Sequence, residues 1–220
     1  MSVLPSGTGG TPHYSATILA DDPDGLLPSG AYAEAWKLVM PECSTRGYPN
    51  FGLNLVRIGD KLLISAEAAG FRTGVDANGN GGVDQSGAGR VYAYTYSTSA
   101  APGAPTMISS PSPGTNRFFG TGLTAYDAGG AYVAVGEPSG SGGTVHFFQL
   151  GTDMNGKVTA SFTKSLQDPL FTPGRLTGFG AHLRSAGPLL LFGSPSSDDE
   201  GQTYSGGLYH FISSDTQPTP

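Results

Sequence analysis

Hydrophobic positions along this chain form short blocks separated by small and polar residues. Blocks such as 131–135 and 189–192 are rich in β-branched, aromatic and aliphatic residues. Clusters of Gly and Pro lie between the blocks, and both residues favour turns and interrupt helices. No segment shows the 3.6-residue period of an amphipathic helix. The pattern therefore predicts many short strands and an all-β fold.

The same order of blocks occurs three times. Each copy opens with a Phe-Gly pair and a short strand, then continues with a tight turn, an apolar strand and a Gly/Ser-rich loop. A strand that alternates aromatic and small residues closes the copy. The Phe-Gly pairs begin at positions 51, 119 and 179, and the closing strands begin at 89, 143 and 207. Segments 105–109 and 158–163 supply a fourth strand, and four strands make a propeller blade.

The three copies resemble the FG-GAP repeats of integrin α-chain β-propellers, most closely the short bacterial variant of the repeat. The core of that family is Phe-Gly, an apolar strand, Gly-Ala-Pro, and Gly-x-Val-Tyr-Val-Tyr/Phe. Gly136-Glu137-Pro138 and Gly193-Ser194-Pro195 match the Gly-Ala-Pro element with one change each, and Ala66-Glu67-Ala68 stands in its place in the first copy. The resemblance implies a β-propeller-like array of about three four-stranded antiparallel blades.

The resemblance extends over residues 36–212 and divides the chain. We expect an N-terminal segment with a partial blade (1–35), three repeats (36–100, 101–155 and 156–212) and a polar tail (213–220). The strand that begins at Trp36 looks like the outer strand of an incomplete blade, and the third repeat lacks such a strand. Three blades are fewer than the usual four to eight. Either the N-terminal segment completes the array, or copies of the chain associate.

Charge and composition restrict the partners of this protein. The net charge is −6 and the 11 basic residues are scattered, which argues against a nucleic-acid partner. No apolar run reaches the roughly 18 residues of a membrane span, so membrane insertion is not expected. Charged residues are 13% of the chain, and the loops are rich in Gly, Ser and Thr. With no signal peptide visible at the start, this composition fits an extracellular location or a particle surface, including a virion.

One loop carries the spacing of a calcium-binding loop. Asp76, Asn78, Asn80 and Asp84 stand at positions 1, 3, 5 and 9, with Gly81 at position 6. The same residues also fit an Asn/Gly-rich surface turn. Calcium-binding FG-GAP repeats hold their loop directly after Phe-Gly, whereas this loop lies in an insertion before the third strand of its repeat. Calcium is therefore a candidate ligand, and no cofactor is required.

Two glutamates are the candidates for catalysis. Glu67 and Glu137 are predicted to occupy equivalent positions in neighbouring repeats, with Ser194 at that position in the third. A pair of carboxylates roughly 5–10 Å apart can hydrolyse a glycosidic bond. Equivalent residues of a repeat also lie close together for architectural reasons alone. His146 and His210 are likewise predicted to be equivalent, and no G-x-S-x-G motif marks a nucleophilic serine.

These observations favour a protein that is not an enzyme. We expect a binding or structural module of a cell or virion surface, with loops for protein or glycan contacts and with self-association of the chain. Two alternatives remain open: a calcium-dependent lectin that uses the Asp76 loop, and a carbohydrate-active hydrolase that uses Glu67 and Glu137.

Overall fold

The computed structural model describes most of the chain from residue 50 onward, together with two strands before it. The described residues are 15–21, 32–39, 50–67, 71–72, 84–85, 87–97, 100–139, 142–169, 177–196 and 206–212. All regular elements in these ranges are β-strands, which confirms the all-β prediction. Every pairing between the named strands is antiparallel.

Three antiparallel sheets make up the body of the molecule. The first sheet has the order β3 (Phe51–Ile58), β4 (Lys61–Ala66), β7 (Arg90–Thr95), β8 (Thr106–Ile108). The second sheet has β9 (Leu123–Asp127), β10 (Ala131–Glu137), β11 (Thr144–Thr152) and β12 (Val158–Gln167) in that order. The third sheet contains β13 (His182–Ala186), β14 (Leu189–Ser194) and β15 (Gly207–Ile212). Each is a meander, because consecutive strands are neighbours.

Two hairpins accompany these sheets. β1 (Ser15–Asp21) pairs with β2 (Tyr32–Val39), and β5 (Phe71–Arg72) pairs with β6 (Asp84–Gln85). The strand predicted at Trp36 is therefore present, paired with a partner inside the N-terminal segment. The predicted fourth strands of the first two repeats are β8 and β12, and each forms the outer edge of its own sheet.

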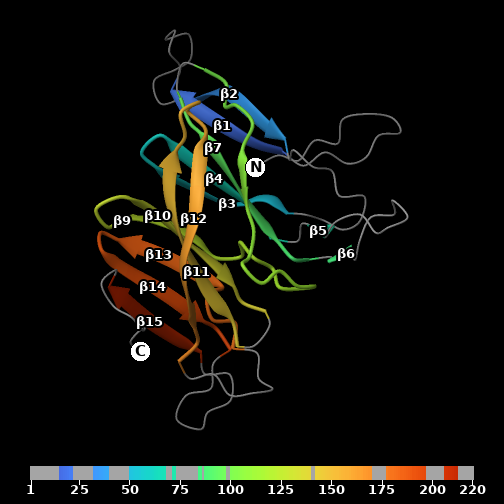
Figure 1. Cartoon of the computed structure of the whole chain (residues 1–220), viewed down its shortest axis with the longest axis vertical. Helices are drawn as coiled ribbons and strands as arrows, with labels where there is room; N and C mark the ends of the chain where they lie inside the picture. Colours follow the sequence, from blue (N-terminus) through green and yellow to red (C-terminus); the bar gives the residue numbers. More distant parts are fainter. Residues whose placement is uncertain are drawn as a thin grey trace.

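The sheets follow one another in a row along the long axis of the molecule, with the β1–β2 hairpin at one end and the third sheet at the other (Figure 1). The first strands of successive units are in contact: β1 with β3, β3 with β9, and β9 with β13. The described residues therefore form an open row, in which each sheet packs its face against the next.

Hydrophobic clusters fill both spaces between the sheets. One face of the second sheet, including Val133 and Val135, packs on Leu63 and Val91 of the first sheet. Its other face packs on the third sheet, and Ala134 of β10 belongs to this second cluster. Alternate residues of β10 point to opposite faces, as the period of a strand requires. The second sheet is thus covered on both faces.

A repeated backbone geometry marks each Phe-Gly pair. The residues on either side of Phe51, Phe119 and Phe179 all have positive φ: Asn50 and Gly52, Phe118 and Gly120, Gly178 and Gly180. In the second and third copies the Phe backbone forms a parallel bridge to a glycine of the preceding repeat, Gly89↔Phe119 and Gly143↔Phe179. A Cβ on Gly89 would lie 2.1 Å from the Phe119 carbonyl oxygen, so the close approach requires glycine.

Candidate functional site

The strand register corrects the predicted equivalence of the two glutamates. Glu137 lies opposite Thr144, and Ser194 lies opposite Gly207 in the third sheet. The corresponding residue of the first sheet is Ala66, which lies opposite Arg90. Glu67 is one residue further along the chain, so the prediction that Glu67 and Glu137 are equivalent is wrong. Because side chains alternate along a strand, a shift of one residue changes the face to which they belong.

Glu67 joins the end of the first sheet to the loops around it. Its carboxylate accepts hydrogen bonds from Asn50 Nδ2 at 3.0 Å and from Thr121 Oγ1 at 2.8 Å. Thr121 follows the second Phe-Gly pair, so this contact connects two repeats. No hydrogen bond or ion pair between Glu67 and Glu137 is found in the described part of the chain. The two carboxylates have separate sets of partners.

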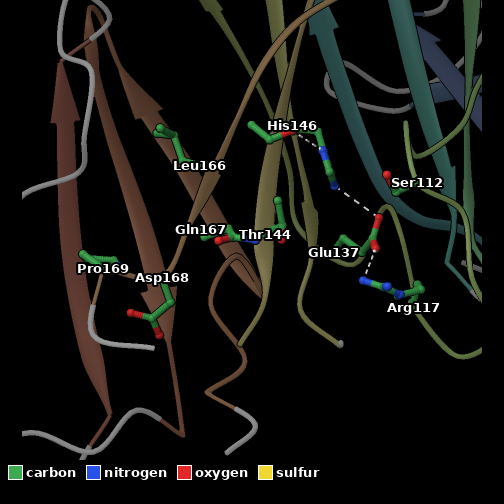
Figure 2. Close-up of a pocket in the computed structure, with 10 residues that line it drawn as sticks. Ser112, Arg117, Glu137, Thr144, His146, Leu166, Gln167, Asp168 and Pro169 are labelled. Carbon is green, nitrogen blue, oxygen red and sulfur yellow. Dashed lines mark hydrogen bonds and ion pairs between the residues drawn. The ribbon is translucent and has the colours of Figure 1, made fainter. Parts of the chain in front are cut away.

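Glu137 lies at the end of β10 and is 2% exposed. Arg117 Nη1 donates to its Oε1 at 3.3 Å, and His146 Nε2 lies 3.2 Å from its Oε2. The other ring nitrogen of His146, Nδ1, lies 2.8 Å from Ser165 Oγ. Figure 2 shows the Glu137 carboxylate between the Arg117 guanidinium and the His146 ring. A buried carboxylate of this kind is stabilised by a cation and a second donor.

The hydrogen bonds between Glu137, His146 and Ser165 depend on which of their atoms carry protons. An ionised carboxylate can only accept, and in that state of Glu137 the hydrogen bond is donated by His146 Nε2. In a neutral ring Nδ1 then accepts the hydroxyl proton of Ser165. Serine, histidine and glutamate are thus connected in a line, as in the catalytic triads of hydrolases. No sequence motif indicates this arrangement, because strand pairing alone brings Ser165 opposite His146.

These groups line a pocket between the loop that joins β8 to β9 and the ends of β10, β11 and β12. The pocket has a volume of about 620 Å³, and its lining is mostly polar. Ser112 and Gln167 are exposed members of the lining, whereas Glu137 and His146 are buried in its wall. The lining residues are Ser112, Arg117, Glu137, Thr144, His146, Ser165, Leu166, Gln167, Asp168 and Pro169.

Asp168 belongs to a second polar cluster, which sequence reasoning missed. Its carboxylate accepts from the Tyr209 hydroxyl at 3.1 Å and from Ser194 Oγ at 3.4 Å, and Asp168 is 4% exposed. Tyr209 and Ser194 are the register equivalents of His146 and Glu137. A signal for Asp168 was present in the sequence, because Asp168-Pro169 after β12 corresponds to Ser110-Pro111 after β8, and Ser110 is also buried.

The register also separates His146 from His210. His146 corresponds to Tyr209, and His210 corresponds to Phe147, so the predicted equivalence of the two histidines is wrong. His146 is buried and faces the first sheet, whereas His210 is exposed. Only the first therefore contributes to the pocket.

The predicted calcium loop lies almost entirely outside the described residues. Asp76, Asn78 and Asn80 are not described, and of Asp84 only the backbone is, in β6 opposite Arg72. Calcium binding by this loop stays a prediction. In the ranges that the structure describes, no group of three His, Cys, Asp or Glu side chains is arranged to hold a metal ion.

No family model matches this sequence, and no curated protein is found to be significantly similar to it. Within the described residues, no helix is long and apolar enough to cross a membrane.

Proposed function

We propose that this chain is a non-enzymatic binding or structural module of a cell or virion surface, built from FG-GAP-type blades. Its loops provide contacts to protein or glycan, or take part in assembly. Support comes from the three similar sheets joined by the same Phe-Gly geometry. A row of packed sheets can hold loops in position for contacts with a partner. The same architecture can serve many functions.

The observation that carries the non-enzymatic assignment is that both candidate carboxylates have structural partners. Glu137 is held by Arg117 and His146, and Glu67 is held by Asn50 and Thr121. A pair for glycoside hydrolysis needs two carboxyl groups facing one bond, with one of them free to donate a proton. Contacts that join strands and loops account for Glu67 and Glu137 without catalysis.

A turnover assay tests this assignment. The wild-type protein, Glu67→Gln and Glu137→Gln are incubated with a panel of fluorogenic glycosides, and we expect no release of fluorophore by any of them. Hydrolysis by the wild type that either substitution abolishes, with the melting temperature retained, contradicts the proposal. Glycan-array binding tests the positive side, and we expect Gln167→Ala, which removes an exposed amide from the pocket, to weaken any binding there.

The line of Ser165, His146 and Glu137 supports a second candidate function, acyl hydrolysis with Ser165 as nucleophile. Arg117 argues against it, because its guanidinium already neutralises the carboxylate that would have to stabilise a charged His146 during reaction. A fluorophosphonate probe distinguishes the two functions. We expect no labelling of the wild type; labelling that is lost in Ser165→Ala supports the hydrolase.

The calcium-dependent lectin depends on residues 76–80 and is tested separately. Calcium that binds the folded chain raises its melting temperature by mass action. A rise that disappears in Asp76→Ala supports that alternative, and an unchanged melting temperature removes it.

A further inference from the structure

The outward face of the third sheet has the character of a buried interface. We call the side chains of Leu191, Leu208, His210 and Ile212 the tail face. Leu208 lies opposite Gly193, as Val145 lies opposite Gly136 and Val91 lies opposite Ser65. Val91 and Val145 are each 0% exposed beneath the following sheet, whereas Leu208 is 64% exposed. The position that the first two sheets bury is open in the third.

Neighbouring positions of the tail face are likewise buried in the first two sheets and open in the third. Leu191 pairs with His210, as Ala134 pairs with Phe147 in the second sheet and Leu63 with Ala93 in the first. All four of these earlier residues are 0% exposed. Leu191 is only partly buried, His210 is exposed, and Ile212 is 43% exposed. Large exposed apolar side chains gathered on one face mark an interaction surface.

The backbone beside the tail face also matches the two junctions inside the chain. Gly206 precedes β15 with a φ of 75°, as Gly89 and Gly143 precede their strands with φ of 81° and 86°. Those two glycines bridge to Phe119 and Phe179 of the following repeat. The atoms nearest to a Cβ on Gly206 belong to Pro195 and Ser194 of its own sheet. Gly206 therefore has the geometry of a junction, and within the described residues no further sheet packs on it.

The first sheet also has exposed apolar side chains at positions that the other sheets bury. We call the side chains of Leu53 and Leu55 the head face. Leu55 of β3 pairs with Ile64, as Leu123 pairs with Val135 and Leu183 with Phe192. Leu123 and Leu183 are 2% and 1% exposed against the preceding sheet, but Leu55 is 47% exposed. Leu53 beside it is also 47% exposed. The β1–β2 hairpin, which contacts β3, thus leaves these side chains of the head face uncovered.

We propose that the tail face binds the head face of a second copy of this chain, in a head-to-tail contact beside the β1–β2 hairpin, where Leu38 already packs on Ile64 and Tyr92 of the first sheet. The first and third sheets, which carry these faces, lie apart along the row with the second sheet between them, so the two faces belong to different copies when they meet (Figure 1). Such a contact is heterologous, and it forms a closed ring or an open row of copies according to its rotation. The inference rests on the proposed function, an assembling surface module, and it names the partner.

Complementary variants test the proposal. The wild-type chain is measured by light scattering and native mass spectrometry over a concentration series, alongside Leu208→Asp and Leu55→Asp. We expect the wild type to associate, and each variant alone to associate at least about tenfold more weakly, because a charge opposes burial in the contact. Met154→Asp, a change at a fully exposed loop residue outside both faces, is the control and should associate like the wild type.

The decisive measurement mixes the two variants. Leu208→Asp keeps an intact head face and Leu55→Asp keeps an intact tail face, so an equimolar mixture should form a heterodimer that goes no further. A wild type that is monomeric at every concentration overturns the proposal. So does a heterodimer that fails to form while both variants retain the wild-type melting temperature. Association of Leu55→Asp alone that is as strong as that of the wild type also overturns it, because it indicates a symmetric contact. A failure of the proposed function would instead appear as hydrolysis of a glycoside or an ester in the assays described above. The two failures are therefore distinguishable.

Discussion

Glu137 is a carboxylate in the wall of a largely apolar junction, and its neighbours explain how it is tolerated there. Arg117 reaches it from the loop before the second Phe-Gly pair, and its side chain is 35% exposed. His146 approaches from the adjacent strand and is 7% exposed. Burial of a charge is unfavourable unless it is paired and hydrogen-bonded, so the arrangement depends on both neighbours.

Removal of Arg117 should therefore destabilise the fold through Glu137. We expect Arg117→Ala to lower the free energy of unfolding by about 1–2 kcal/mol, less than for a fully buried pair because the guanidinium is partly solvated. In a Glu137→Gln background the same substitution should cost less than about 0.5 kcal/mol, since no buried charge is left unpaired. Urea denaturation of the four proteins measures the coupling. Equal losses in both backgrounds would show that the ion pair does not stabilise the fold.

Two buried tyrosines make the stability sensitive to alkaline pH. Burial raises the pKa of Tyr94 and of Tyr126 from 10.0 to about 12. The folded state therefore holds these protons more tightly than the unfolded state. The contribution of the two tyrosines to the free energy of unfolding is complete below pH 10 and is lost as the pH rises to about 12.

The expected loss is about 2–3 kcal/mol for each tyrosine across this window. Denaturation at a series of pH values measures it, and the double variant with Tyr94→Phe and Tyr126→Phe should show a much shallower decline. An unchanged decline in that variant would contradict the assignment. Both substitutions retain the aromatic ring, so packing is preserved.

At the scale of single residues, the sequence predicted which side chains are candidates for function better than it predicted which side chains contact one another. Glu137 was identified as a candidate, but Arg117 and Ser165 reach it through a loop and a strand register that the sequence does not specify. The wrong equivalence with Glu67 has a specific physical cause. The first copy has Ser65-Ala66-Glu67 where the others have Gly136-Glu137-Pro138 and Gly193-Ser194-Pro195, and a shift of one residue is invisible without the hydrogen-bonded partner strand.

At the scale of elements, the junction between the second and third sheets contains a close backbone contact at Gly136. A Cβ built on Gly136 would lie 1.9 Å from the carbonyl oxygen of Gly180. Gly136 pairs with Val145 near the end of the ladder between β10 and β11, and its φ is not in the left-handed region. Space alone, and not backbone strain, therefore requires glycine here.

Gly136→Ala should consequently separate the two sheets locally. We expect a loss of about 2–3 kcal/mol or more in the free energy of unfolding, as for overpacked cores. Gly103→Ala is the matched control, because nothing lies within 4 Å of a Cβ there and its φ is ordinary. Thermal melting of both variants checks the prediction. Comparable stability of the two would mean that the backbone moves apart at little cost.

The strands were more predictable than their junctions. Continuous apolar runs predicted β4, β10 and β14, and the alternating aromatic strands predicted β7, β11 and β15. The extra residues between Phe51 and Leu55 that shift the register of β3 against β4 could not be predicted, because both registers leave an alternating pattern. The β1–β2 pairing was also not predicted, since ten residues (22–31) separate the two strands, whereas the commonest hairpins have two-residue loops.

At the scale of the whole molecule, the sheets differ in how well they are covered. The second sheet packs on both faces, whereas the third has three strands and an open tail face. Local opening requires less energy where fewer apolar contacts are broken. The row should therefore open from its third sheet.

Hydrogen exchange measures this gradient. At low protein concentration, we expect the amides of β14 to exchange at least about tenfold faster than those of β10. Association through the tail face should slow exchange in β15 as the concentration rises. Equal protection of β10 and β14 in the dilute protein would contradict the gradient.

The junctions have a mechanical consequence. Inside a sheet each strand is held by a ladder of paired residues. Between sheets there is one isolated backbone bridge, Gly89↔Phe119 or Gly143↔Phe179, with apolar packing and scattered hydrogen bonds such as Thr121–Glu67 and Thr124–Ser185. Tension along the row falls on the contacts between sheets before it reaches the ladders. Under tension the molecule should therefore lengthen in separate steps. Each step is the separation of two neighbouring sheets, while the sheets themselves stay folded.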